Sequence, residues 1–376
     1  MMALSRADTS VLGRWWWTVD RWTLAALLSL VGFGYVMLLA ASPGVAERIG
    51  ASSRDMFILK QVFFLAAATA VMVSISVMPV KLVRRLALLG CIGALLMTMA
   101  TLSVGVEIKG ARRWLHLPGL TIQPSEFMKP CFAVVAAWLL AEGRNYGWRA
   151  YAAVGVLFFM IVGTLAKQPD MGMLMVVASV FFAQLFVVGI NIFLVAGCGV
   201  VGVLGAVGAY FTMPHFRDRL NRFLDPASGD TYQVTVAMEA FGHGGLLGVG
   251  PGEGRLKAML PDAHADFVYA VAGEEFGMMI CLLILGVFGF IVLRGLLRLL
   301  GERDMFIILG ATGLLTQFGL QAFINMASAL HLIPTKGMTL PFISYGGSSV
   351  VAVALGAGML LALTRRRISR AAQDEE

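Results

Sequence analysis

The chain has 376 residues, of which 59% are hydrophobic, and its formal net charge is +7. A soluble domain averages about 45–50% apolar residues, and the excess here lies in long uncharged blocks. This pattern excludes a soluble globular domain. It predicts an all-α polytopic membrane protein.

A helix needs about 20 apolar residues to cross the hydrocarbon core of a bilayer. On that criterion we predict ten transmembrane helices in one membrane domain, residues 22–364, between tails of residues 1–21 and 365–376. One long polar loop, residues 212–267, separates the seventh span from the eighth. The predicted spans are 22–42, 57–77, 86–106, 126–142, 150–166, 171–188, 191–211, 268–293, 304–326 and 342–364.

The short basic segments 79–85, 294–304 and 365–370 fall on one side if the N-terminus is cytoplasmic, as the positive-inside rule expects. We therefore expect both termini in the cytoplasm and the loop 212–267 outside. Cations in short loops on the outer face run against the rule and predict an anionic ligand there, whereas long loops are exported regardless of charge. These outer cations include Lys109, Arg112, Arg113, Lys129, Lys167 and Lys336.

Glu126 and Lys129 are three residues apart at the start of the fourth span, so they share one helix face. The simplest interpretation is an N-cap at Ser125 followed by an ion pair within the helix. The alternative is that Lys129 binds an anionic ligand, because ionisable groups inside spans are usually functional.

Gln168-Pro169-Asp170 joins two short spans. The proline ends the first helix, and Asp170 is expected to cap the second. Lys167 is an alternative partner for Asp170, and a direct chemical role for this carboxylate is left open.

The middle of the long loop, residues 242–254, is rich in glycine. It is not a nucleotide-binding loop, because no strand precedes it and no Gly-Lys-Ser/Thr element follows. We interpret it as a flexible turn at the membrane interface. Residues 231–241 before it are expected to form an amphipathic helix on the membrane surface.

The long loop ends with Asp262, His264 and Asp266 directly before an apolar run. Asp266 is either the cap of the eighth span or a catalytic base, because a carboxylate at a membrane boundary is partly desolvated. His264 could tune it. Glu274 and Glu275 follow inside the span and must face protein or water.

The last loop contains Pro334, Lys336, Gly337 and Pro341, which predict a rigid turn on the outer face. Gly346-Gly347-Ser348-Ser349 is expected to provide a small-residue surface for close helix packing. The four cysteines all lie in apolar runs and fit no metal site, so we interpret them as packing residues.

Five blocks resemble the SEDS proteins, the shape, elongation, division and sporulation polymerases of bacterial cell walls. The resemblance runs in order over about residues 22–365, and the Pro-Thr-Lys-Gly turn is similar to the division branch (FtsW) rather than the elongation branch (RodA). Two positions depart from the family pattern: Ala265 stands where threonine is common, and residues 252–254 replace a more usual Gly-Asn-Ser. The blocks are Gly110–Trp114, Gln123–Lys129, Gln168–Asp170, Pro261–Phe267 with Gly273-Glu274-Glu275, and Pro334–Ser349.

The resemblance implies a peptidoglycan glycosyltransferase that polymerises lipid II outside the membrane during septal wall synthesis, with an inverting mechanism and Asp266 as general base. It matches Arg113, Trp114, Lys129 and Lys336 to residues of the family motifs, and we assign lipid II binding to these four together with Glu126 and His264. We assign supporting roles to Gln168, Asp170, Glu274 and Ser344.

The expected location is the bacterial inner membrane at the division septum. The expected partners are lipid II, glycan linked to undecaprenyl diphosphate, a class B penicillin-binding transpeptidase (FtsI-like) and other division-complex membrane proteins, with no nucleic acid. No metal site is predicted, although a divalent cation (Mg²⁺ or Mn²⁺) bridging Asp266 and the lipid diphosphate is left open. Two alternatives remain: a lipid II flippase, which should show a site between repeated halves, and a division scaffold without catalysis.

Overall fold

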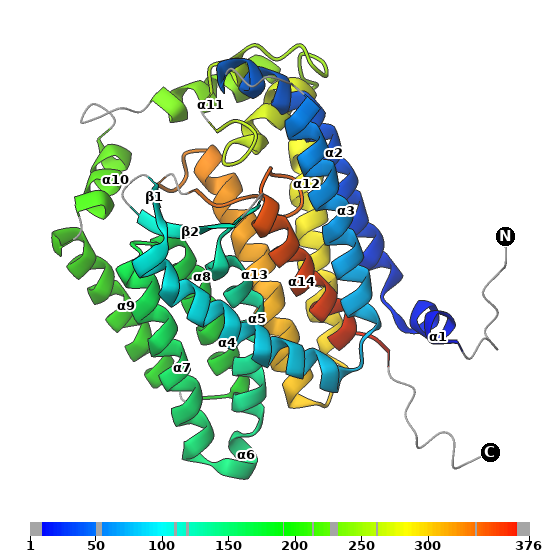
Figure 1. Cartoon of the computed structure of the whole chain (residues 1–376), viewed down its shortest axis with the longest axis vertical. Coiled ribbons are helices and arrows are strands. Elements are labelled where there is room, and N and C mark those ends of the chain that lie inside the picture. The colour runs from blue at the N-terminus through cyan, green and yellow to red at the C-terminus, as the bar shows by residue number, and fades with distance from the viewer. Residues whose placement is uncertain are drawn as a thin grey trace.

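The computed structural model describes residues 10–49, 55–108, 111–117, 120–190, 192–212, 214–225, 232–260, 262–334 and 337–366. Within them the chain folds into a bundle of long helices with one small sheet (Figure 1). The helices are α1 (Val11–Thr18), α2 (Arg21–Ile49), α3 (Asp55–Val77), α4 (Val80–Val104), α5 (Pro124–Ala141), α6 (Gly143–Tyr146), α7 (Trp148–Lys167), α8 (Met171–Val188), α9 (Ile192–Thr212), α10 (Pro214–Leu224), α11 (Tyr232–Gly244), α12 (Val268–Leu299), α13 (Met305–Ala329) and α14 (Gly347–Leu363), with a 3-10 helix η2 (Leu256–Ala258). The strands are β1 (Val106–Ile108), β2 (Ala111–Leu117) and β3 (Leu120–Ile122).

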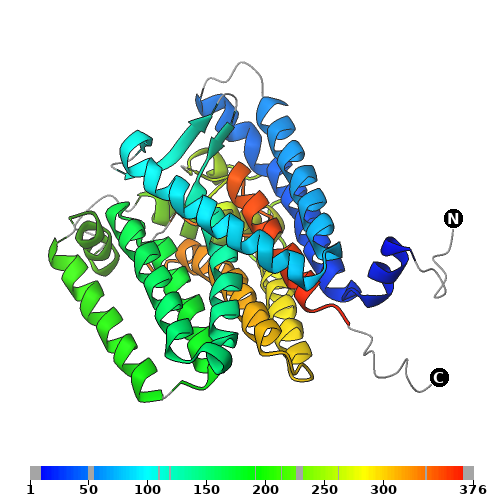
Figure 2. The ribbon, with the colours of Figure 1, turned by 60° about the horizontal axis from the view of Figure 1, so that its bottom comes forward.

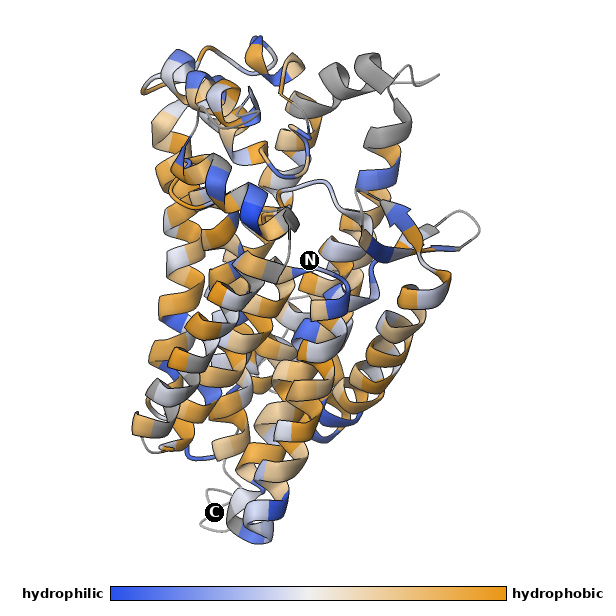
Figure 3. Ribbon diagram, turned by 90° about the vertical axis from the view of Figure 1, so that its left-hand side faces the viewer, coloured by the Kyte–Doolittle hydropathy of each residue, from blue (hydrophilic) through white to orange (hydrophobic). Residues whose placement is uncertain are grey.

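Each predicted span coincides with one helix: α2, α3, α4, α5, α7, α8, α9, α12, α13 and α14. In the described part of the chain, seven of these are long and apolar enough to cross a membrane, and α14 is a shorter apolar helix. Apolar residues run along the height of the bundle, and hydrophilic ones gather at its two ends (Figure 3). The prediction of a helical protein with several membrane spans is confirmed, and the number ten stays a prediction.

The centre of the bundle is formed by α13, α5 and α14. Helix α13 packs against α5, α8 and α12, while α14 packs against α3 and α5. The close approach of α14 to α3 depends on glycine. A Cβ on Gly347 would lie 2.8 Å from the Phe64 ring, and one on Gly358 would lie 2.7 Å from the Met72 carbonyl oxygen. The expected small-residue packing surface at the start of the last span is therefore present.

The predicted all-α fold is wrong for the loop between α4 and α5, which forms a three-stranded antiparallel sheet in the order β1-β2-β3. Val106 pairs with Trp114, and Leu115 pairs with Ile122. β-Branched and aromatic residues favour strands, and here they occur in runs too short for a confident pattern. Figure 2 shows the strands between the end of α4 and the start of α14.

Two predicted boundaries are also corrected. Helix α4 begins at Val80 after an N-cap at Pro79, so Arg84 and Arg85 belong to the helix and not to a linker. Helix α14 begins at Gly347 and not at the predicted residue 342. Phe342 has a positive φ of 64°, which is incompatible with a right-handed helix, and residues 341–343 form a turn.

The long loop is more structured than its composition suggests. It contains α10 and α11, and α11 confirms the helix predicted at 231–241. Helix α11 packs on α12 and buries Val236, Ala237 and Ala240, so one of its faces contacts protein. Its expected position on a membrane surface stays a prediction.

The opposite end of the bundle is tied together by Asp20. Arg294 and Arg298, both on α12, contact its carboxylate at 2.8 and 2.9 Å. Burial alone would raise the pKa of Asp20, but these hydrogen bonds outweigh it and lower the pKa from 3.8 to about 2. At the same end the Arg366 amide donates to the Thr18 carbonyl at 2.9 Å. The first and last described segments therefore lie on one side of the bundle.

Candidate active site

Asp266 lies in the turn between η2 and α12. Helix α12 begins at the end of the bundle near which the sheet lies (Figure 1). The turn is built on the Asp262 carbonyl, which accepts the amides of Ala265 at 3.0 Å and Asp266 at 3.1 Å. The N-cap of α12 is Phe267, without a side-chain cap. The interpretation of Asp266 as a helix cap is therefore wrong. Its side chain is only partly buried.

The backbone of this turn is held at three consecutive carbonyl oxygens. The His264 carbonyl accepts the Tyr345 amide at 2.8 Å, and the Ala265 carbonyl accepts the Ser344 hydroxyl at 2.5 Å. The Asp266 carbonyl accepts the Asn325 side-chain amide at 3.0 Å. The first two donors lie in the last loop and the third on α13, so two distant segments fix the turn.

The last loop also approaches the Asp266 side chain. A Cβ on Gly337 would lie 3.2 Å from Asp266 Oδ2, so any side chain at position 337 would crowd the carboxylate. Lys336, a predicted substrate-binding residue, is outside the described residues. The next residue along the chain, Gly337, lies against the Asp266 side chain.

Lys129 and Glu126 form the expected ion pair, with Nζ 2.8 Å from Glu126 Oε2. The expected N-cap at Ser125 is wrong, because α5 begins at Pro124 with Gln123 as its N-cap. Lys129 is only 2% exposed, and its ammonium also donates to Gln321 Oε1 at 2.9 Å. In this arrangement the Lys129 ammonium binds Glu126 and Gln321. Its predicted contact with a diphosphate requires the diphosphate to replace one of these partners.

This ion pair connects to the last loop through hydroxyl and amide groups. The Ser349 hydroxyl lies 3.3 Å from Glu126 Oε2 and 2.6 Å from the Thr339 hydroxyl. The Gln321 amide donates to the Thr339 carbonyl at 3.0 Å. These contacts form a closed polar ring inside the apolar bundle. Its members come from α5, α13, α14 and the last loop, and they are Glu126, Lys129, Gln321, Thr339 and Ser349.

Arg113 on β2 binds the whole of the Gln168-Pro169-Asp170 motif. Its guanidinium donates to the Gln168 carbonyl at 3.1 Å and the Pro169 carbonyl at 2.7 Å, and it lies 3.5 Å from Asp170 Oδ2. The ion-pair partner of Asp170 is therefore Arg113 and not the adjacent Lys167. The predicted cap is confirmed, because Asp170 Oδ1 accepts the Met173 amide at 3.1 Å.

The sheet that carries Arg113 and the half-buried Trp114 is joined to the last loop. The Gln123 amide, just after β3, donates to the Ser348 hydroxyl at 3.2 Å. Gln168 reaches in the other direction, and its side-chain amide donates to the Thr98 carbonyl and the Thr101 hydroxyl of α4. The separate polar motifs of the sequence therefore meet at one end of the bundle.

His264 turns toward α2 and α3. With Met37, Gln61 and Tyr345 it borders a gap too narrow for a water molecule, and its ring lies 5.2 Å from that of Tyr345. Burial lowers the pKa of His264, opposed by the nearby Asp262 carboxylate. The acidic neighbour that affects the imidazole is thus Asp262, and a tuning effect of His264 on Asp266 stays a prediction.

Glu274 and Glu275 are fully buried and hold the glycine-rich segment of the long loop. Glu274 Oε1 accepts the amides of Arg255 at 2.8 Å and Leu256 at 2.9 Å, and its Oε2 accepts the Lys257 amide at 3.1 Å. Glu275 accepts the Gly252 amide at 3.0 Å and pairs with the Lys257 ammonium.

These contacts attach the glycine-rich turn to α12, and its expected flexibility at the membrane interface stays a prediction. The glycines are needed where backbones touch. A Cβ on Gly244 would lie 1.9 Å from the Gly273 carbonyl oxygen, and one on Gly248 would lie 2.2 Å from the Glu275 carbonyl oxygen. Helix α12 is itself broken here at Gly277, whose φ is 78°. The segment packs into this break.

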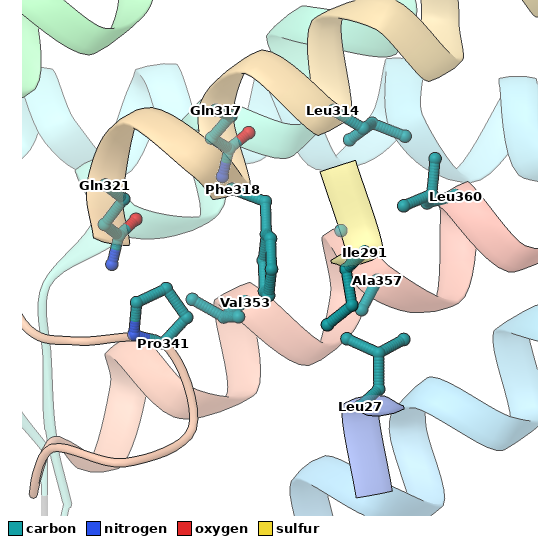
Figure 4. Close-up of a pocket in the computed structure, with 11 residues that line it drawn as sticks. Leu27, Ile291, Leu314, Gln317, Phe318, Gln321, Pro341, Val353, Ala357 and Leu360 are labelled. Carbon is teal, nitrogen blue, oxygen red and sulfur yellow. The ribbon is translucent and has the colours of Figure 1, made fainter. Parts of the chain in front are cut away.

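Sequence reasoning missed Gln321 and Asn325. Their signal was present, because Gln317, Gln321 and Asn325 follow one another at intervals of four residues in an apolar helix and so share one face. Gln317 and Gln321 border an internal cavity with Phe318 and Pro341 (Figure 4). The volume of this cavity is about 10 Å³, which is the lower limit for holding one water molecule. It is too small for a lipid-linked sugar.

Among the described residues, no group of three or more His, Cys, Asp or Glu side chains could hold a metal ion. A cation bridging Asp266 and a diphosphate would therefore depend on the ligand for most of its coordination, and we assign no step to it.

Known proteins resemble this chain over nearly its whole length. Residues 21–368 match the family model described as "Cell cycle protein", which covers FtsW, RodA and SpoVE. The probable peptidoglycan glycosyltransferase FtsW of Caulobacter vibrioides is 43% identical over 366 residues, which cover 97% of this chain and 94% of that protein. The protein of the same name from Trichlorobacter lovleyi is 32% identical and covers 90% of this chain and 91% of its own length.

Two solved structures share the fold. A chain from "Structural coordination of polymerization and crosslinking by a peptidoglycan synthase complex" superposes with a TM-score of 0.77 at 27% identity, covering 92% of this chain and 97% of that one. The rod shape determining protein RodA of Thermus thermophilus gives a TM-score of 0.66 at 27% identity, covering 93% and 97%. The chain therefore belongs to the FtsW, RodA and SpoVE family of cell cycle proteins.

Proposed function

We propose that this chain is a peptidoglycan glycosyltransferase that polymerises lipid II into glycan strands during septal wall synthesis. The names of its curated relatives support the activity, since a protein 43% identical over 366 residues is a probable peptidoglycan glycosyltransferase. The observation that carries the assignment to a site is the Asp266 turn. Its three consecutive carbonyls are fixed by the last loop and α13, while the side chain stays partly exposed beside Gly337.

Asp266 acts as general base in this proposal. It takes the proton of the acceptor GlcNAc 4-hydroxyl while that oxygen attacks the anomeric carbon of the donor MurNAc. The bond to undecaprenyl diphosphate breaks as the new glycosidic bond forms, with inversion at the anomeric carbon. The diphosphate is already a good leaving group, so no general acid is required.

Negative charge develops on the leaving diphosphate, and preorganised cations stabilise such charge efficiently. Arg113 and Lys336 are our candidates for direct contact. Arg113 is about a quarter exposed while it binds the backbone of residues 168 and 169, so it is both fixed and accessible. Lys129 contributes from within the polar ring, where it helps to hold the last loop through Gln321.

In this proposal the reaction takes place on the outer face of the inner membrane at the division septum, and the chain has ten spans and both termini in the cytoplasm. The cluster of Arg294, Arg298 and Arg366 at the opposite end of the bundle supports this orientation under the positive-inside rule. We further propose that the chain works with a class B penicillin-binding transpeptidase and other division proteins. A solved relative comes from a peptidoglycan synthase complex.

The direct test uses purified lipid II and the chain co-purified with its transpeptidase. Asp266→Asn keeps the shape of the side chain and removes the base, so polymerisation should fall about 10²–10⁴-fold. A parallel transport assay in proteoliposomes separates the flippase alternative. Lipid II movement that survives in Asp266→Asn, with no glycan formed even by the unaltered chain, would favour a carrier. Wild-type glycan synthesis by Asp266→Asn would refute the proposed base.

A further inference from the structure

One face of α13 carries three amide side chains, Gln317, Gln321 and Asn325, each four residues from the next. Spacing by four places them one above the other along the helix. All three are buried, and Asn325 is 0% exposed. Most buried amides hydrogen-bond to a partner, so the contacts of this row indicate what the helix holds in place. The side-chain oxygens of Gln317 and Asn325 are buried without such a partner, so the amide nitrogens carry the contacts.

Asn325 joins the two chain segments that meet at Asp266. Its Nδ2 donates to the Asp266 carbonyl at 3.0 Å and to the Met338 carbonyl at 2.6 Å. A primary amide nitrogen carries two hydrogens, so both are used. One side chain therefore fixes the residue proposed as base and the residue next to Gly337.

Gln321 repeats this arrangement one turn earlier. Its Nε2 donates to the Thr339 carbonyl at 3.0 Å, and its Oε1 accepts the Lys129 ammonium at 2.9 Å. Together Gln321 and Asn325 bind two consecutive carbonyls of the last loop. Of the two, Asn325 also reaches the Asp266 turn, so it sets the distance between that turn and Gly337.

We infer that Asn325 is a positioning residue for the glycosyl transfer proposed above: it holds the Asp266 backbone and the last loop at a fixed separation, so that the Asp266 carboxylate meets the acceptor hydroxyl. This inference rests on the proposed function. Asparagine suits the task because its amide is neutral and offers two donors on a short stem. An ionised carboxylate at this position would repel both carbonyl oxygens, and alanine would remove both of these hydrogen bonds.

The test measures kcat and KM for lipid II polymerisation by the chain co-purified with its transpeptidase. Asn325→Ala should lower kcat by about 100-fold, the loss expected from a displacement of about 1 Å at the reacting atoms, with KM little changed. The matched control is Gln317→Ala, which removes a buried amide from the same helix face at the cavity (Figure 4). The control should keep the kcat of the unaltered chain.

Asn325→Asp provides a readout that a loss of packing would not produce. Burial favours the neutral form of the introduced acid, which donates one hydrogen bond, whereas the ionised form donates none. The rate of Asn325→Asp relative to the unaltered chain should therefore rise as the pH falls. It also serves as the second variant if Asn325→Ala does not fold.

The outcomes separate this inference from the proposed function. If Asp266→Asn is inactive while Asn325→Ala keeps its kcat, the positioning role is refuted and the proposed function stands. Equal losses of kcat in Asn325→Ala and Gln317→Ala, or a relative rate of Asn325→Asp that does not change with pH, also refute the role. If Asp266→Asn polymerises lipid II normally, the assignment of Asp266 as general base fails. If the unaltered chain forms no glycan, the proposed function itself fails.

Discussion

Two acidic sites lie within ten residues of each other at the start of α12, and they use their atoms in opposite ways. At Glu274 and Glu275 the carboxylates fix the long loop, because they are fully buried and accept hydrogen bonds from the backbone amides of residues 252 and 255–257. At Asp266 the backbone is fixed instead, because the Asn325 side-chain amide donates to the Asp266 carbonyl. The Asp266 carboxylate stays partly exposed.

The difference teaches how to distinguish a structural carboxylate from a functional one in a membrane protein. Both kinds are rare in apolar surroundings, and rarity alone marks them as functional candidates. Burial separates them here. A fully buried carboxylate that accepts backbone amides is a support, and a partly exposed carboxylate on a backbone fixed by other side chains is accessible to a ligand.

The largest effect on stability is expected from Glu274→Ala. It removes the acceptor of three partly buried backbone amides, and a fully buried amide left unpaired costs about 1–3 kcal/mol. The free energy of unfolding should fall by about 3 kcal/mol, visible as a lower melting temperature in detergent. Glu253→Ala, at an exposed position of the same loop, is the control and should melt like the unaltered chain. Equal melting of both variants would remove the contrast between the two acidic sites.

A smaller and different effect is expected from Gly337→Ala. The added Cβ would lie 3.2 Å from Asp266 Oδ2, so the carboxylate must move by a few tenths of an ångström. The polymerisation rate should fall, by less than the roughly 100-fold cost of a 1 Å displacement, with an unchanged melting temperature. Gly286→Ala, whose Cβ meets nothing within 4 Å, should change neither quantity. An unaffected rate in Gly337→Ala would show that the last loop does not shape the site of Asp266.

The smallest effect concerns pH and His264. Burial lowers the pKa of this imidazole below its usual 6.5, so the unfolded chain binds a proton that the folded chain does not. Stability is therefore highest above pH 6.5 and decreases as the pH falls toward the folded pKa. His264→Gln should reduce this acid sensitivity in melting curves recorded between about pH 7 and 5. An identical pH dependence in the variant would show that the pKa of His264 is the same in the folded and unfolded chains.

Much of the fold could be predicted from the sequence, because long apolar blocks give a strong signal for helices in a membrane. The cap at Asp170 and the Glu126–Lys129 pair were predictable for a related reason, since both depend on neighbours within one helix turn. The short strands of residues 106–122 were not predictable, because their runs carry too little pattern.

The architecture around Asp266 lies beyond sequence reasoning for a physical reason. Its turn is held through main-chain carbonyls, which every residue has, by Ser344 and Asn325, which are about 60–80 positions away. The same holds for the glycine-rich segment. Its composition suggests flexibility, while its glycines serve close contacts with Gly273 and Glu275 in the broken helix.

The central claim is that the Asp266 carboxylate is chemical and the Glu274 carboxylate is structural. The most direct measurement is the polymerisation rate per folded molecule, recorded with the melting temperature, for Asp266→Asn and Glu274→Ala prepared with the transpeptidase. Asp266→Asn should melt like the unaltered chain and lose about 10²–10⁴-fold in rate, while Glu274→Ala should melt early. A wild-type rate in Asp266→Asn, or a fall in its melting temperature equal to that of Glu274→Ala, would contradict the account.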